Sequence, residues 1–143
     1  MTLRETLRQT LREKGIAGAC DLVPYTKVIG LECHEDDGGL LTVMPFKPSN
    51  IGNTQLPSVH GGVVGALLEH AAAMHLIWEN DTDRLPKIVN ISIDYLRPCG
   101  PYDTFARAQV VKQGRTVANV RVEAWQQDPG KLVAAAHAHF LLG

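Results

Sequence analysis

The chain is poor in the features that mark several classes of protein. Its three cysteines, Cys20, Cys33 and Cys99, are scattered and odd in number, which argues against a disulfide framework and fits a reducing compartment. Neither sign of charge is in excess, because 14 basic side chains face 15 acidic ones and the formal net charge is -1. The chain therefore lacks the basic footprint of proteins that bind nucleic acid or anionic membranes, and we expect neither as a partner.

Long hydrophobic runs are missing as well. The N-terminus is charged and has no apolar signal core. The most apolar stretch, residues 59–78, is interrupted by Glu69 and three histidines, which the centre of a bilayer would make costly. Hydrophobic residues make up 45% of the 143 residues and charged residues 20%, enough to bury one globular core. We expect a single cytoplasmic domain over residues 1–143.

The first part of the chain predicts a helix and two strands. Leucines at four-residue spacing predict a short amphipathic helix as an N-terminal extension, residues 1–15, ended by Gly15. Two short stretches with β-branched and aromatic residues, 25–34 and 40–46, predict strands. An Asp-Gly turn signal at residues 35–39 predicts that these strands form a hairpin.

The second part predicts one long helix followed by four strands. Residues 58–78 form the helix, with Ser58 as its N-cap, and it is so apolar that we expect it to be buried. Apolar and polar residues alternate over 90–95 and 118–125, with turn signals between the runs, which favours antiparallel strands. This order predicts an α+β fold in which the sheet curls around the helix.

The start of the long helix has an unusual composition. Gly61 and Gly62 follow His60, and each glycine in a helix costs roughly 1 kcal/mol relative to alanine, so we expect a function that offsets this cost. Their N–H groups are unpaired donors at the positive end of the helix dipole, and a ligand carbonyl can approach where no Cβ intervenes. Glu69 lies on the same apolar helix, where a carboxylate is costly to bury without a partner or a purpose.

The spacing of these groups predicts a shared site. Seven residues separate Gly62 from Glu69, which is on the order of 10 Å along a helix axis. One chain does not easily place both groups on one small reacting carbon. Two antiparallel copies of the helix would, with Gly62 of one facing Glu69 of the other, so we expect a dimer with twofold symmetry.

The motif resembles a known family. A His-Gly-Gly that opens a helix, followed by an acid nine positions after the His, is similar to the hotdog-fold thioesterases of the PaaI-like and Glu-using hydroxybenzoyl-CoA thioesterase branches. Residues 91–98 and 114–118 also resemble that group, and the resemblance covers about residues 25–142. It implies a hotdog fold, hydrolysis of an acyl-CoA thioester with no cofactor besides the CoA of the substrate, and a homodimer or homotetramer with sites at the interface.

The resemblance also implies roles for single residues. Glu69 would act as nucleophile or as general base for water. The Gly62 N–H would polarise the thioester carbonyl, and His60 would lie near the thioester. Asn53 matches loosely a polar position that holds the water or the acid, with Asn50 as its competitor. For the CoA phosphates, the resemblance points to three basic residues near strand ends: Arg97, Lys112 and Arg115.

Several alternatives stand beside these roles. Glu69 could be a buried acid paired with a nearby His or Arg, and His60 could be only a capping residue. We expect no metal, because His70 and His75 lie on different helix faces and no acid or cysteine completes a zinc spacing. No cysteine has an activating base beside it in sequence, although folding could bring one near.

Two other functions fit the same fold. A non-enzymatic acyl-CoA-binding module usually lacks the acid, and Glu69 after His-Gly-Gly argues against it. An acyl-thioester dehydratase or hydratase favours a different His-containing motif, which the sequence does not contain.

Overall fold

The computed structural model describes residues 1–143 except 54 and 56. In chain order the elements are α1 (Leu3–Ala19), the 3-10 turn η1 (Cys20–Leu22), α2 (Pro24–Ile29), β1 (Glu32–Asp36), β2 (Gly39–Met44), the 3-10 turn η2 (Pro48–Asn50), β3 (Ile51–Asn53), β4 (Ser58–Val59), α3 (Gly61–Asn80), β5 (Lys87–Tyr95), β6 (Thr104–Gln113), β7 (Val117–Trp125) and β8 (Leu132–Leu141). Apart from the two positions left out, no helix has both the length and the hydropathy to cross a bilayer.

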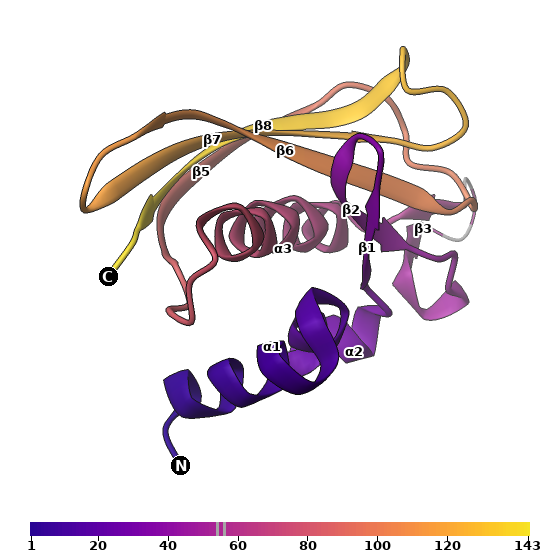
Figure 1. Ribbon diagram of the computed structural model, residues 1–143. Helices are drawn as coiled ribbons and strands as arrows, with labels where there is room; N and C mark the ends of the chain where they lie inside the picture. The colour runs from indigo at the N-terminus through magenta and orange to yellow at the C-terminus, as the bar shows by residue number, and fades with distance from the viewer. Residues whose placement is uncertain (54, 56) are drawn as a thin grey trace.

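The main sheet curls over the long helix α3 (Figure 1). It has six strands in the order β1-β2-β6-β7-β8-β5, and each neighbouring pair is antiparallel. Helix α3 lies against its concave face, while α1 and α2 lie on the side of α3 that faces away from the sheet. The expected α+β hotdog architecture, with four strands after the long helix, is confirmed.

The core lies between α3 and the sheet. Leu67, Leu68 and Leu76 of α3 are completely buried, as are Val120 and Val122 of β7. Each buried side chain of this size stabilises the fold by roughly 1.5–3 kcal/mol. The apolar character of α3 on nearly every face is explained by the sheet on one side and the N-terminal helices on the other.

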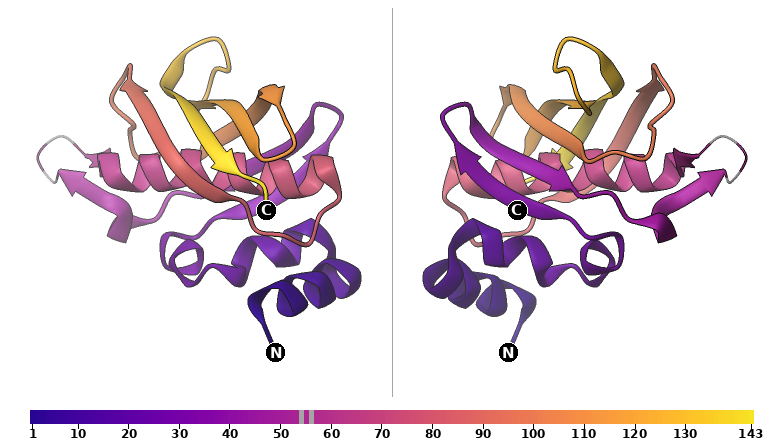
Figure 2. Two further views of the ribbon diagram at one scale, coloured as in Figure 1. Left: turned by 90° about the vertical axis from the view of Figure 1, so that its left-hand side faces the viewer. Right: turned by 90° about the vertical axis from the view of Figure 1, so that its right-hand side faces the viewer.

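The two edges of the sheet differ (Figure 2). At one edge, β1 and β2 form the predicted hairpin, in which Asp36 pairs with Gly39. Gly39 has a φ of 110°, a conformation that favours glycine. The other edge is β5, nine residues long, with the apolar side chains of Val89 and Tyr95 more than half exposed. A long apolar edge strand is a surface that proteins usually cover.

One predicted strand is wrong in its first half. Residues 24–29 form the helix α2, and only residues from Glu32 onward join the sheet as β1. Pro24 stands in the first turn of α2, where its fixed φ suits a helix and its missing N–H is not needed. Gly30 ends α2 in the left-handed region with a φ of 84°. These two residues outweigh the β-branched composition of the segment between them.

The ends of two predicted helices also differ from the structure. Gly15 does interrupt the N-terminal helix, with a φ of 69°, but a further helical turn continues to Ala19. The N-cap of α3 is His60 rather than Ser58. Ser58 belongs to the short strand β4, which pairs with β3, and the Val59 N–H donates to the Cys99 carbonyl at 2.7 Å. These backbone bonds hold the chain extended up to the residue before the helix.

Candidate active site

His60 organises the start of α3. As N-cap, its Nδ1 accepts a hydrogen bond from the Gly62 N–H at 2.9 Å, so the capping role considered for His60 is present. The Gly62 N–H is therefore occupied in this structure. The Gly61 N–H has no acceptor among the described residues. On the other face of this turn, the Tyr95 hydroxyl donates to the Gly61 carbonyl at 2.8 Å.

The loop before α3 holds His60 in place through close backbone contact. The His60 N–H donates to the Asn50 carbonyl at 2.9 Å, and the buried Asn50 side chain donates to the Ile29 carbonyl at 2.9 Å. A Cβ at Gly52 would lie 2.9 Å from His60 Cα, so only glycine fits there. Asn50 is thus committed to holding the loop. The side chain of Asn53 lies outside the described part of the structure.

Glu69 is half-buried and lines a cavity of about 190 Å³. Apolar side chains form most of its wall, among them Ile29 of α2, Ile88 of β5 and Phe140 of β8. Among the described residues, no hydrogen bond or ion pair involves the Glu69 carboxylate, so the alternative of a paired structural acid finds no partner there. An acid without a partner at the wall of an apolar cavity is a candidate for a catalytic group.

A second hollow lies beside the start of α3. It measures about 300 Å³ and is lined by Gly61 together with Tyr95, Leu96 and Arg97 at the end of β5. The Glu69 cavity instead adjoins the beginning of β5 and shares no lining residue with this hollow. Within one chain, the acid and the free helix N–H therefore face two separate spaces at opposite ends of the same edge strand.

The three basic residues predicted for CoA do not gather in one chain. All three are exposed. Arg97 follows β5 near the start of α3, and its Nη1 donates to the Leu132 carbonyl at 2.8 Å. Lys112 and Arg115 lie near the β6–β7 turn. Gln113, at the end of β6, forms a hydrogen bond with Asn80, the last residue of α3. Arg97 alone lies beside the Gly61 hollow.

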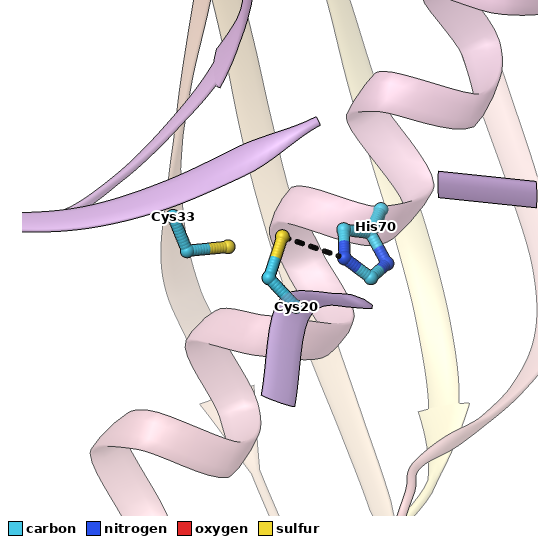
Figure 3. Close-up of side chains that lie close together, drawn as sticks. All are labelled: Cys20, Cys33 and His70. Atoms are coloured by element: carbon cyan, nitrogen blue, oxygen red, sulfur yellow. Dashed lines mark hydrogen bonds between the residues drawn. The ribbon is translucent and has the colours of Figure 1, made fainter. Parts of the chain in front are cut away.

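Folding brings a base to a cysteine, as the sequence could not show. Cys20 Sγ lies 3.3 Å from His70 Nε2, and Cys33 Sγ completes a buried group of three (Figure 3). Burial lowers the pKa of His70 to about 4, so the ring is neutral at ordinary pH. Hydrogen bonding between the two thiols raises the pKa of Cys20, as does its burial, and lowers that of Cys33. Cys20 and His70 are 50 residues apart, so no spacing reveals this cluster.

Comparison with known proteins identifies the family. A model of the thioesterase superfamily matches residues 56–133, more than half of the chain. The chain belongs to the thioesterase superfamily. A medium/long-chain acyl-CoA thioesterase, YigI of Salmonella typhimurium, is 25% identical over 135 residues, which are 85% of this chain and 86% of YigI. The expectation of a hotdog-fold thioester hydrolase is confirmed.

Solved structures agree with this assignment. A protein from Chromobacterium violaceum is 40% identical and covers 97% of both chains with a TM-score of 0.78. A Ralstonia eutropha protein described as phenylacetic acid degradation-related is 27% identical and covers 94% of this chain and 98% of its own, with a TM-score of 0.75. A Bacillus halodurans protein solved with CoA shares the fold at 20% identity, with a TM-score of 0.72 over 99% of this chain and 88% of its own.

Proposed function

We propose that this thioesterase hydrolyses acyl-CoA thioesters with Glu69 as its catalytic carboxylate. The observation that supports this most is the lone half-buried acid at the wall of an apolar cavity. The apolar wall suits an acyl group, and Glu69 at its side would act on the thioester carbon or on a water beside it. As general base, Glu69 takes a proton from water while the oxygen attacks the carbonyl carbon. The CoA sulfur then leaves with its electron pair and is protonated.

The start of α3 would stabilise the negative charge that develops on the carbonyl oxygen. Because the Gly62 N–H donates to His60, the donor with no acceptor at this helix end is the Gly61 N–H. A fixed N–H at the positive end of a helix dipole stabilises an oxyanion without reorganising during the reaction. Gly62 would then hold the His60 ring, and the Gly62 N–H becomes a donor to the substrate only if that ring turns away.

A complete site needs a second copy of the chain. Gly61 and Glu69 are eight residues apart, about 12 Å along the helix axis, and face separate hollows. A twofold axis through the middle of the β5 edge would pair the start of one β5 with the end of the other. That pairing joins the Glu69 cavity of one chain to the Gly61 hollow of its partner, and continues the sheet across the interface.

The CoA group would extend outward from this junction. Arg97 beside the Gly61 hollow is the best-placed cation for a phosphate, since its guanidinium is exposed and its neighbours form the rim. Lys112 and Arg115 lie far from it within one chain. We propose them only as contacts contributed by another subunit of the assembly.

A panel of acyl-CoA esters tests the activity. Thiol release scored as kcat/KM over aromatic, medium-chain and long-chain acyl groups would give the substrate class, and no release from any member would favour the binding-module alternative. Glu69→Gln is expected to lower turnover by about 10²–10⁴-fold. Label found in Glu69 after a single turnover in heavy-oxygen water would identify the carboxylate as the nucleophile, because general-base hydrolysis places the label only in the product acid.

Subunit complementation tests the shared site. Gly61→Pro removes the N–H in question at the first helical position, where proline is favoured, and His60 already has the extended ψ of 133° that proline requires before it. Glu69→Gln and Gly61→Pro should each be inactive alone. Co-expressed, they should recover about one quarter of parental activity, since half of the dimers are mixed and one of two sites in each is intact. A mixture that stays inactive would contradict the shared site.

A further inference from the structure

The buried group of Cys20, Cys33 and His70 has no role in the proposed reaction, although His70 also lines the Glu69 cavity. It joins three elements that are distant in sequence: η1, β1 and α3. The three side chains are nearly inaccessible, with exposed fractions of 0%, 2% and 7%. Their ligand atoms all lie within 4.8 Å of one another, and Figure 3 shows the Cys20 sulfur between the Cys33 sulfur and the imidazole ring of His70.

We propose that these three residues form a structural zinc site. Two thiolates and an imidazole are a three-ligand set for Zn²⁺ that leaves a fourth position open, with Zn–S near 2.3 Å and Zn–N near 2.0–2.1 Å. In a tetrahedral site the donor atoms are then about 3.5–3.8 Å apart. The Cys20–His70 pair is already at 3.3 Å, so side-chain shifts of about 1 Å or less would complete the geometry. Water or a small ligand would take the fourth position.

The charge of the complex suits this location. Zn²⁺ with two thiolates and a neutral imidazole has no net charge, whereas an isolated thiolate or an unpaired cation would be costly in the core. Binding releases the two thiol protons to solvent. Asp21 and Glu32 act electrostatically on Cys20, and their negative charge favours a cation at this point.

The site would fix the N-terminal extension to the long helix. Cys20 follows α1 directly, and His70 is the residue after Glu69 on α3. Zinc would therefore hold α1 and η1 against the helical turn that presents the proposed catalytic acid. This role is structural, so it is tested by metal binding and stability rather than by turnover.

Cobalt provides an optical test on the unmodified protein. The full-length chain, purified under reducing conditions and stripped with a chelator, is titrated with Co²⁺ and then with Zn²⁺. We expect one metal per chain, thiolate-to-cobalt charge-transfer absorption that zinc abolishes, and a Tm that rises by about 8 °C when free zinc exceeds its Kd a hundredfold. Absence of the charge-transfer band, or a Cys20–Cys33 disulfide in place of metal, would overturn the proposal.

Single substitutions then locate the site. Cys20→Ser and Cys33→Ser should each abolish stoichiometric binding and the Tm rise. Cys99→Ser is the matched control, because Cys99 is also buried but bonds to Thr104 at 3.3 Å, outside the cluster. Cys99→Ser should bind as the parent does. Stoichiometric binding kept in both Cys20→Ser and Cys33→Ser would show that the metal is held elsewhere, and the parent's cobalt spectrum stays decisive if a variant fails to fold.

Discussion

Glu69 is an acidic side chain without a hydrogen-bond or ion-pair partner among the described residues. It is half-buried against apolar side chains, and none of the described residues bonds to its carboxylate. A group in such a setting contributes to function while it lowers stability, as active-site residues often do. A structural acid would show the opposite balance, because removal of one partner from a buried pair is destabilising.

This contrast gives a prediction for stability at Glu69. Glu69→Gln should leave the free energy of unfolding unchanged or raise it by up to about 1 kcal/mol, because a neutral amide costs less to bury than a carboxylate. Urea unfolding of the purified variant measures this. A loss of about 1–3 kcal/mol would instead identify Glu69 as a paired structural residue.

His60 combines a capping role with a position at the proposed site. His60→Asn keeps a short side chain that caps helices well, so we expect the free energy of unfolding to change by less than about 0.5 kcal/mol. The imidazole is lost, and kcat/KM should fall at least about tenfold if it contacts the thioester. His60→Ala, which lacks any cap, should in addition be less stable by about 1 kcal/mol. Asparagine with full activity would leave His60 with the capping role alone.

At the scale of elements, the alternation of apolar and polar residues and the residues typical of turns predicted most of the fold. The alternating runs became β5 and β7, and the Asp-Gly signal became the β1–β2 turn. The strand predicted before β1 was wrong because that segment forms a six-residue helix, which is too short to show a helical period in its sequence. Pro24 begins this helix and Gly30 ends it. The start of α3 was misplaced by two residues because the pairing of β3 with β4 is a tertiary contact that no local pattern shows.

For the candidate site, the sequence shows the features that lie within one helix and does not show those that depend on tertiary contacts. The His-Gly-Gly…Glu motif is contiguous on one helix, so sequence alone indicates it. Which glycine keeps a free N–H depends on the rotamer of His60, and the cysteine–histidine cluster depends on three separate elements. The three cationic residues were predicted from strand ends, but strand ends lie at both extremities of a sheet.

An ion pair between elements gives a pH prediction. Arg107 of β6 donates to both Asp36 carboxylate oxygens of β1 at 2.9 and 2.8 Å, and holds the pKa of Asp36 down to about 2. Because the folded pKa lies below the unfolded one, the pair stabilises the fold above about pH 4, and this contribution disappears as the pH falls toward 2. Arg107→Gln should therefore be less stable than the parent at pH 7, with the difference shrinking toward pH 2.

Urea unfolding at several pH values measures this difference. Arg115→Gln is the control, since Arg115 is exposed and forms no ion pair among the described residues, so it should follow the parent throughout. A difference between Arg107→Gln and the parent that does not vary with pH would mean that Arg107 acts through packing rather than through its charge.

At the scale of the whole molecule, the unpaired sheet edge and the two proposed half-sites of one chain all adjoin β5. This strand is a sheet edge, its backbone groups on the side away from β8 have no strand partner in the described chain, and the two proposed half-sites lie at its two ends. An unprotected edge of nine residues would invite uncontrolled pairing. A second copy paired antiparallel about a twofold axis would cover the β5 edge and join the two half-sites, whereas a monomer would do neither.

A charge on this edge should separate the subunits. Val89 of β5 is 57% exposed, and Val89→Lys would place an ammonium group from each chain in the apolar interface while leaving each chain's own core unchanged. Val111→Lys is a matched control, since Val111 is also 57% exposed but lies on β6, away from the β5 edge. Sedimentation should find monomers for Val89→Lys and the parental assembly for Val111→Lys. Thioester turnover should be lost with the dimer, because Glu69 would no longer face a partner's Gly61. A monomeric Val89→Lys variant that kept the parental kcat/KM would place the whole site within one chain.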